Sequence, residues 1–325
     1  MLACAAAFPY ERGMSTLADR LLRSLQPTAD GELLVIVGET ASGKTPLALE
    51  IARRVGGEVI GADSVQVYRG FDVGSGKPTR DELAGVPHAL IDVAGPLEAF
   101  DAGRFISLAD EAIAAAHAAG RVPIVCGGTF LWVRALIFGL AQAPSAPPEV
   151  RAALQADVAR EGSPALHARL AAVDPSSASR LHPNDAVRIV RALEVHQTTG
   201  KTLSAWQSEH GFRTVRHRAR LVAIAHEREA IEARIARRVD AMLAAGWIDE
   251  VEALIAKGYG EARAMSAVGY AQVRAHVRGE LPREELATQI TRATRIFARR
   301  QRTWLRGAEV EWLPANGAAS LDSIG

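Results

Sequence analysis

Short apolar runs alternate with helix-like stretches through the first part of the chain. Four runs have the length and continuous hydrophobicity of strands buried in a parallel sheet, at 33–37, 58–62, 89–93 and 122–126. Between them, apolar residues recur at helical spacing, as at Leu47, Ile51 and Val55, and again within the Ala-rich segment 101–119. Alternating strands and helices predict the α/β class, with an open parallel sheet flanked by helices and joined by right-handed crossovers.

The alternation stops at the Pro-rich segment 141–148, which predicts a boundary. The pattern from 149 to 205 is helical, the apolar run 220–225 predicts a return to the sheet, and helical patterns then resume as far as 306. The expected organisation is an N-terminal extension at 1–30, partly disordered; the first part of the α/β core at 31–146; a helical insertion domain at 147–212; the second part of the core, with a basic C-terminal helix, at 213–315; and a tail at 316–325.

The first predicted strand runs directly into Gly38-Glu-Thr-Ala-Ser-Gly-Lys-Thr45, which matches the P-loop pattern GxxxxGK[ST]. Strand, glycine-rich loop and helix follow in the order that this motif requires. The loop N–H groups and the helix N-terminus can hold a phosphate, Lys44 adds a positive charge, and the Thr45 hydroxyl is a ligand for Mg²⁺. The bound group is a di- or triphosphate, and the residues predicted to bind it are Gly38, Glu39, Thr40, Ala41, Ser42, Gly43, Lys44 and Thr45.

Two polar residues follow other predicted strands and should share the sheet edge with the P-loop. Asp63 follows the second strand, and Thr129 follows the fourth strand after two glycines. Ligands of open α/β sheets bind at the carboxyl ends of the strands. Asp63 is therefore a candidate Mg²⁺ ligand, general base or turn-capping residue, and Thr129 is a candidate ligand-binding or capping residue. Asp92 stands at the end of Ala89-Leu-Ile-Asp92 in the third run, and it resembles the acidic residue that often closes the hydrophobic strand of a nucleotide hydrolase, which is compatible with a kinase.

The net charge of +1 conceals an asymmetry between the two halves. Residues 1–150 carry 12 Lys and Arg against 17 Asp and Glu, a net −5, whereas residues 151–325 carry 26 against 20, a net +6. Arginines of the last predicted helix share one face, and Ile290, Phe297 and Trp304 are its expected buried side. Solvated helix faces usually mix charges of both signs, so a single-sign face favours contact with nucleic acid phosphates. This arginine stripe comprises Arg292, Arg295, Arg299, Arg302 and Arg306.

Cysteine usage and hydropathy restrict the compartment and the function class. Cys4 and Cys126 form neither a CxxC pair nor a zinc-binding spacing, which is typical of a reducing cytoplasm. No apolar run approaches the length of a membrane span, so we expect no membrane association. The residues alone leave open a small-molecule P-loop kinase, an RNA-modifying transferase and a non-catalytic RNA-binding protein.

Several motifs occur together as they do in the bacterial tRNA dimethylallyltransferases, also called tRNA isopentenyltransferases, and the chain resembles that family from about 33 to 313. The most specific motifs are Asp63-Ser-Val-Gln-Val-Tyr-Arg-Gly70 and Arg299-Arg-Gln-Arg-Thr-Trp-Leu-Arg306. Further matches, in consistent order, are the P-loop, Gly127-Gly-Thr129, Asn184-Asp-x-x-Arg-Ile-x-Arg-Ala-Leu-Glu194, Arg234-Ile-x-x-Arg238 and Val268-Gly-Tyr270. Positions 266, 267 and 271 depart from the family, in which basic residues are frequent beside the last motif.

The resemblance implies transfer of a dimethylallyl group from dimethylallyl diphosphate to N6 of the adenine 3′-adjacent to the anticodon, in tRNAs that read codons beginning with U. It implies that Asp63 and Thr129 are catalytic, with Asp63 accepting the amine proton, and that Arg234 and Arg238 join the P-loop in binding the diphosphate. Mg²⁺ is the implied cofactor with Thr45 as its ligand, the implied partner is the anticodon stem-loop of tRNA, and a monomeric cytoplasmic enzyme is expected. The residues implied to bind tRNA are Asp63, Ser64, Val65, Gln66, Arg151, Val187, Arg188, Ile189, Val190, Arg191, Arg299, Arg300, Gln301, Arg302, Thr303, Trp304, Leu305 and Arg306.

Overall fold

The computed structural model of the protein describes residues 32–83 and 85–315. Within them, six strands form one parallel sheet in the order β3-β2-β4-β1-β5-β6, which confirms the predicted fold class. The strands are β1 (Leu33–Val37), β2 (Gly57–Ala62), β3 (His88–Ala89), β4 (Val122–Gly127), β5 (Ala219–Ala225) and β6 (Glu311–Pro314). The expected extension at 1–30 and tail at 316–325 lie outside the described residues.

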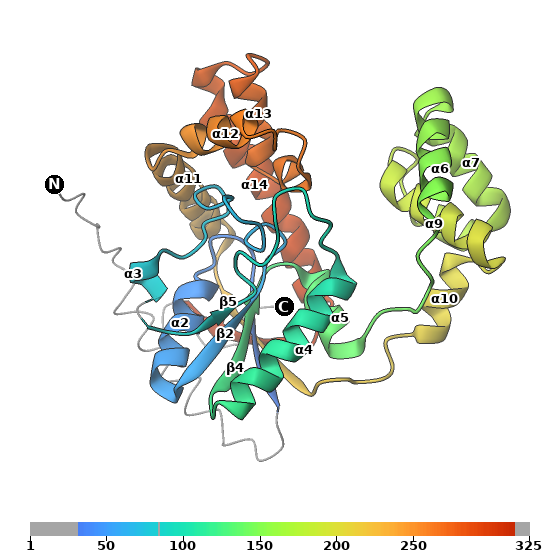
Figure 1. The fold of residues 1–325 in the computed structure, drawn as a ribbon. Helices are drawn as coiled ribbons and strands as arrows, with labels where there is room; N and C mark the ends of the chain where they lie inside the picture. Colours follow the sequence, from blue (N-terminus) through green and yellow to red (C-terminus); the bar gives the residue numbers. More distant parts are fainter. Residues whose placement is uncertain (1–31, 84, 316–325) are drawn as a thin grey trace. The chain divides into compact units, whose positions relative to one another are not determined.

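Different helices cover the two faces of the sheet. Leu34 and Ile36 of β1 belong to one core cluster with the apolar side of α2 (Lys44–Val55). Val35 and Val37 point to the opposite face because successive side chains of a strand alternate, and all five β1 residues are buried. α4 (Ala102–Ala118) packs against β2 and β4, and Figure 1 shows the sheet between α2 and α4. Two shorter helices, α3 (Arg80–Leu83) and α5 (Phe130–Phe138), precede β3 and follow β4.

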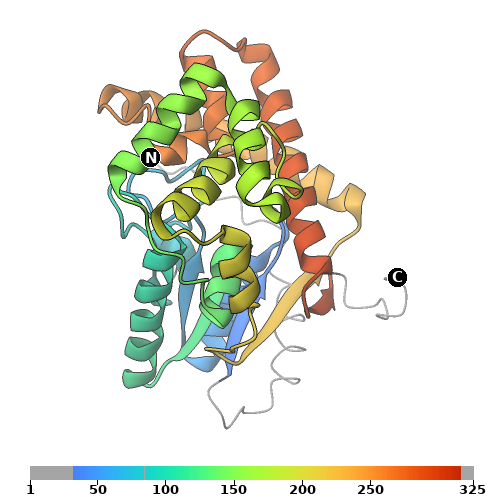
Figure 2. The ribbon, with the colours of Figure 1, turned by 90° about the vertical axis from the view of Figure 1, so that its right-hand side faces the viewer.

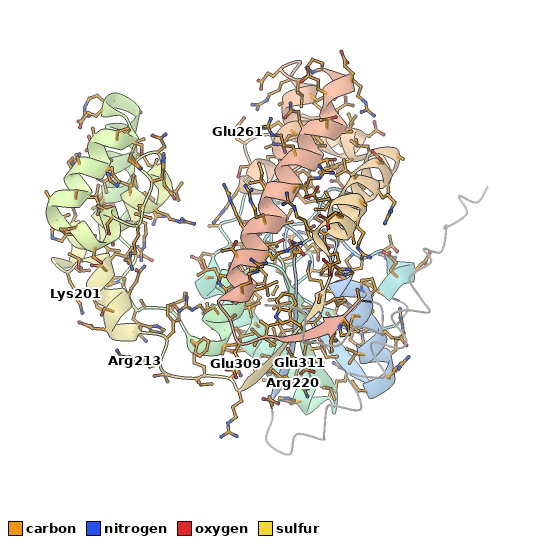
Figure 3. All side chains as sticks on the ribbon, turned by 180° about the vertical axis from the view of Figure 1, so that it is seen from behind. Lys201, Arg213, Arg220, Glu261, Glu309 and Glu311 are labelled. Carbon is orange, nitrogen blue, oxygen red and sulfur yellow. The ribbon has the colours of Figure 1, made fainter. Side chains whose placement is uncertain are left out.

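The helices after β5 cluster around the long C-terminal helix. They are α11 (Arg228–Ala244), α12 (Trp247–Ala256), the 3₁₀ helix η1 (Arg263–Ser266), α13 (Tyr270–Val277) and α14 (Arg283–Arg306). α14 lies along α11, as Figure 3 shows, and buries Leu286, Ile290 and Leu305. This arrangement places α11 and α14 next to the end of β5, where the P-loop also lies because β5 pairs with β1.

Two strands differ from the sequence prediction. The run 89–93 ends as a strand at Ala89, because Leu90 and Asp92 adopt left-handed backbone conformations with φ of 64° and 56°. β6 was not predicted, since Glu-Trp-Leu-Pro at a sheet edge carries too little apolar pattern. Figure 3 shows Arg220 of β5 beside Glu311 of β6, and Arg220 Nε donates to Glu311 Oε2 over 2.7 Å.

Residues Phe138–Arg216 form a second compact unit, drawn from green to yellow in Figure 2. The expected insertion at 147–212 lies inside these bounds. Its core is apolar, with Leu154, Leu166 and Leu193 fully or nearly fully buried. Its helices are α6 (Pro148–Glu161), α7 (Ser163–Val173), α8 (Pro175–Ala178), α9 (Ala186–Thr199) and α10 (Leu203–His210).

Candidate active site

Parallel strand pairing brings the P-loop, Asp63 and Thr129 to one edge of the sheet. Gly127, the last residue of β4, lies opposite both Val37 of β1 and Ala62 of β2. A Cβ at Gly127 would lie 2.1 Å from the Ala62 carbonyl oxygen, so this close approach requires glycine. The chain leaves these three strands at the P-loop, at Asp63 and at the turn before Thr129, and the three candidate segments are therefore neighbours.

Asp63 sits in a turn that leaves one carboxylate oxygen available for chemistry. Its Oδ1 accepts hydrogen bonds from the N–H groups of Val65 (2.9 Å) and Gln66 (3.2 Å). Within the described residues, Oδ2 accepts none. The Ser64 N–H donates to Thr129 Oγ1 over 3.0 Å, so Thr129 holds the first peptide of this turn. The carboxylate is thus fixed through one oxygen, and the other can receive a proton.

The P-loop backbone is shaped to leave the first turn of α2 open toward an anion. Gly43 has a φ of 90°, a conformation that glycine adopts without strain, and it is the N-cap of α2 with no side chain to bond that turn. Lys44 and Thr45 are the first two helical residues, so their N–H groups have no partner within the helix. Ala41 also has a left-handed φ, of 64°, and packing around the loop must maintain it.

Three cationic side chains, those of Lys44, Arg234 and Arg238, are partly buried around this loop. Burial lowers the pKa of Lys44, and the nearby positive charge of Arg238 acts in the same direction. Burial also lowers the pKa of Arg238, whereas the negative charge of Asp63 raises it. The pKa of Arg234 falls to about 10, chiefly through burial and further through Arg237. Each lowered pKa means that the folded protein holds a positive charge at a desolvation cost, which a bound anion would offset.

Side chains from the second half of the chain form hydrogen bonds with each of the four P-loop residues between Gly38 and Gly43. Arg234 Nε donates to the Ala41 carbonyl oxygen (2.6 Å), and His226 Nε2 lies 2.8 Å from the Ser42 carbonyl oxygen. On α14, Gln301 accepts from the Thr40 N–H, and Arg302 Nη2 donates to both carboxylate oxygens of Glu39 at 2.8 and 3.1 Å. Arg234, expected at the diphosphate, thus bonds the loop backbone in this structure.

The loop after Asp63 is held chiefly by Glu250, a residue that the sequence analysis did not single out. The Glu250 carboxylate of α12 accepts hydrogen bonds from the N–H groups of Asp72 (2.9 Å) and Val73 (2.6 Å), and from the Tyr270 hydroxyl (2.7 Å). A Cβ at Gly74 would lie 1.9 Å from Trp247 Nε1, so only glycine fits there. The Val268-Gly-Tyr270 motif therefore supports this loop, with Tyr270 buried.

The arginine stripe lines a groove of about 900 Å³ between α11 and α14. Acidic groups from other segments enter it, because Arg302 pairs with Glu39 and Arg295 Nη1 lies 3.7 Å from Glu232 Oε2. Arg299 has no such partner in the described part of the chain. The stripe thus carries only positive charges along α14, whereas the groove that it lines also contains the acidic side chains of Glu39 and Glu232. The exposed members are Arg292, Arg295, Arg299 and Arg306, with Arg300 and Thr303 exposed beside them.

Several expectations for α14 need correction. Phe297, expected in the core, is 38% exposed, and Trp304 is only half-buried, where it stacks on Phe130 at a ring-centroid distance of 4.3 Å. Gln301 and Leu305, implied to bind tRNA, are buried at 5% and 1% exposure. Their side chains face the P-loop and the protein core, and we assign them to packing and positioning.

The residues expected to bind tRNA in the second unit also divide by exposure. Ile189 and Val190 are buried in its core, which corrects the expectation for their side chains. The first turn of α9 instead exposes Val187, at 81%, beside the exposed Arg188.

Two other arginines implied to bind tRNA, Arg151 and Arg191, meet at the fully buried Glu194 carboxylate. Arg151 forms two hydrogen bonds with it, at 2.7 and 2.8 Å, and Arg191 Nη1 forms one at 2.7 Å. The hydrogen bond to Glu194 raises the pKa of Arg151. Glu194 therefore fixes the orientation of both guanidinium groups.

The oxygen donors beside the P-loop fit a magnesium ion that is held mainly by a substrate. Within residues 32–83 and 85–315, no three His, Cys, Asp or Glu side chains gather as a metal site. Mg²⁺ commonly takes one or two protein oxygens and completes its shell with phosphate oxygens and water. The Thr45 hydroxyl in the first turn of α2 and the Asp63 carboxylate beyond β2 are donors of that kind.

Sequence comparisons identify proteins to which this chain is similar. Residues 66–308 match the profile of the family described as IPP transferase. A relative from Sorangium cellulosum (strain So ce56), named tRNA dimethylallyltransferase, is 58% identical over 89% of this chain and 92% of its own length. A relative of the same name from Anaeromyxobacter dehalogenans (strain 2CP-C) is 53% identical over 84% of this chain and 91% of its own length.

Among the described helices, none has the length and apolar character needed to cross a membrane.

Solved structures agree with the sequence comparisons. The full-length tRNA isopentenylpyrophosphate transferase from Bacillus halodurans has a TM-score of 0.66 and 36% identity, covering 90% of this chain and 92% of that one. A eukaryotic dimethylallyltransferase acting on tRNA has a TM-score of 0.75 and 25% identity, covering 90% of this chain and 76% of that one. The resemblance inferred from the motifs is confirmed: this chain belongs to the IPP transferase family.

Proposed function

We propose that the protein transfers a dimethylallyl group from dimethylallyl diphosphate to N6 of the adenine 3′-adjacent to the anticodon, in tRNAs that read codons beginning with U. The products are N6-isopentenyladenosine and diphosphate. The observation that carries the proposal is the set of three partly buried cations, Lys44, Arg234 and Arg238, around a P-loop at the same sheet edge as the Asp63 carboxylate. A diphosphate would offset their desolvation. The relatives named tRNA dimethylallyltransferase support both substrates.

In the proposed step, N6 of adenine forms a bond to C1 of the dimethylallyl group while the bond from C1 to the diphosphate oxygen breaks. The leaving diphosphate takes the electron pair of that bond, and the amine proton passes to Asp63. An exocyclic adenine amine is a weak nucleophile because its lone pair is delocalised into the ring, so a nearby base assists the attack. Thr129 holds the Asp63 turn through Ser64, which supports a positioning role for its hydroxyl.

The P-loop would stabilise the negative charge on the leaving diphosphate. Lys44 and the N–H groups at the start of α2 bind the diphosphate oxygens, and Arg238 adds positive charge beside Asp63. Thr45 would hold Mg²⁺ together with the diphosphate, and the ion supplies further neutralisation of the negative charge that grows on the leaving group.

The tRNA would bind through two separate basic surfaces. The first is the exposed part of the arginine stripe on α14, and the second is the α9 surface of the second unit, with Val187, Arg188, Arg191 and Arg151. The target adenine lies within a stacked anticodon loop and must leave the stack to reach Asp63. We propose a monomeric enzyme of the cytoplasm.

A small-molecule kinase is not favoured. Its expected acidic residue, Asp92, follows the edge strand β3, which two strands separate from β1 and the P-loop. The Asp92 carboxylate instead bonds Lys77 Nζ at 2.6 Å, and the same ammonium donates to the Tyr68 carbonyl oxygen. Asp92 thus stabilises the loop after Asp63.

The function is tested by incubating the protein with dimethylallyl diphosphate labelled in the prenyl group, Mg²⁺ and unmodified tRNA. Label should appear in RNA, at N6 of the adenine beside the anticodon, and a tRNA whose target adenine is replaced by guanine should stay unlabelled. Turnover of ATP or GTP that a small hydroxyl compound stimulates, without label in RNA, would instead establish the kinase.

We expect Arg299→Ala to weaken tRNA binding similarly for tRNAs of different sequence. An exposed arginine that contacts a phosphate displaces condensed counterions, so its loss should flatten the plot of log affinity against log salt by roughly 0.7–0.9. Binding is measured at several salt concentrations by filter retention. Arg283→Ala, at the other end of α14 and outside the groove, is the matched control and should leave the slope unchanged. An unchanged slope in Arg299→Ala would make the stripe an ordinary solvated surface.

A further inference from the structure

Gln301 is a buried polar residue whose side-chain amide joins two loops of the site. Its Oε1 accepts from the Thr40 N–H over 2.8 Å, and its Nε2 donates to the Gly128 carbonyl oxygen over 3.0 Å. One neighbour offers only a donor and the other only an acceptor, so a single orientation of the amide satisfies both. At 5% exposure, neither bond is readily replaced by water.

The surroundings of Gln301 are fitted to these bonds. A Cβ at Gly128 would lie 2.6 Å from Gln301 Nε2, so this position has room for the amide only as glycine. The next residue, Arg302, pairs with Glu39, the neighbour of Thr40. Two consecutive residues of α14 therefore bond two consecutive residues of the P-loop, which fixes the register between the helix and the loop.

The same amide connects the P-loop to Asp63. Gly128 is followed by Thr129, whose Oγ1 accepts from the Ser64 N–H, and Ser64 is the residue after Asp63. A continuous series of bonds thus runs from Thr40 through Gln301 to the turn that carries the carboxylate. Removal of the amide would leave the Thr40 N–H and the Gly128 carbonyl without this common partner.

We propose that Gln301 is a positioning residue that sets the distance between the diphosphate cradle and Asp63. The inference rests on the proposed transfer reaction, in which N6 must approach C1 while the diphosphate departs on the other side. Such a displacement requires the base and the leaving-group site to be held together accurately, and small misplacements cost large factors in rate. Gln301 itself contacts neither substrate.

The test compares Gln301→Met, which keeps the side-chain length but loses both bonds, with the wild-type enzyme at a temperature where both are folded. We expect kcat/KM for dimethylallyl diphosphate to fall about tenfold or more, as the loss of two hydrogen bonds predicts, with the KM for tRNA changed less than about twofold. Inorganic diphosphate with Mg²⁺ should also raise the unfolding temperature less in Gln301→Met than in wild type. Gln301→Glu keeps the acceptor for the Thr40 N–H but loses the donor to the Gly128 carbonyl oxygen. We therefore expect its kcat to fall, while its KM for dimethylallyl diphosphate rises less than that of Gln301→Met.

Ile290→Val is the control for general destabilisation, because it removes one methyl group from the buried side of the same helix, away from the loops. It should lower the unfolding temperature without changing either KM or the response to diphosphate. If Gln301→Met matches Ile290→Val in all kinetic constants, Gln301 only packs and the inference is wrong. If wild-type enzyme places no label in tRNA, the proposed function itself fails, and these two failures are distinguishable.

Discussion

Asp63→Ala should lose most of its turnover and remain folded. A general base typically contributes about 10²–10⁴-fold to the rate, and Asp63 has one carboxylate oxygen that the turn does not use. The variant also loses the bonds to Val65 and Gln66, which are worth roughly 0.5–1.5 kcal/mol each, so a modest drop in unfolding temperature is expected. The measurement is single-turnover transfer of labelled prenyl group to tRNA, with circular dichroism to verify folding.

Asp63→Asn separates the two roles of this residue. Its side-chain carbonyl can still accept from the Val65 and Gln66 N–H groups, so the turn and the stability should be retained. An amide does not accept the amine proton, so turnover should fall about as far as in Asp63→Ala. If Asp63→Asn keeps a near-normal kcat while Asp63→Ala loses it, Asp63 is a turn-capping residue and another group is the base.

The fold and the centre of the site were predictable because both depend on local patterns. Buried parallel strands are continuous apolar runs, and their carboxyl ends meet at one edge, so Asp63 and Thr129 could be placed near the P-loop because each follows a predicted strand. The structure supplies the reason for Gly127, the first of the two glycines before Thr129, since a Cβ there would collide with the Ala62 carbonyl oxygen.

The bonds that hold the site together were not predictable from local patterns. Gln301 and Thr40 are 261 residues apart, and Glu250 bonds the N–H groups of Asp72 and Val73 at separations of 178 and 177 residues. On α14, Ile290, Phe297 and Trp304 recur every seven residues, which suggested that Phe297 is buried. Positions seven residues apart drift about 20° around an α-helix with each repeat, and the side that is buried depends on the elements against which the helix packs.

Lys44→Met should weaken diphosphate binding and slow transfer while tRNA affinity stays nearly unchanged. A hydrogen bond to a charged group contributes about 1.5–3 kcal/mol, so the KM for dimethylallyl diphosphate should rise by roughly one to two orders of magnitude. The free protein should become no less stable, because burial lowers the pKa of Lys44 and its ammonium is held at a cost at neutral pH.

The unfolding temperature of Lys44→Met is measured with and without inorganic diphosphate and Mg²⁺, alongside tRNA binding at one salt concentration. Wild-type protein should melt higher with diphosphate, because a ligand that binds only the folded state stabilises it, and Lys44→Met should lose most of that increase. Lys257→Met, at the exposed C-terminal end of α12, is the matched control and should behave as wild type. An equal loss of tRNA binding in Lys44→Met would contradict the separation of the diphosphate site from the arginine stripe, because Lys44 lies in the P-loop and the stripe on α14.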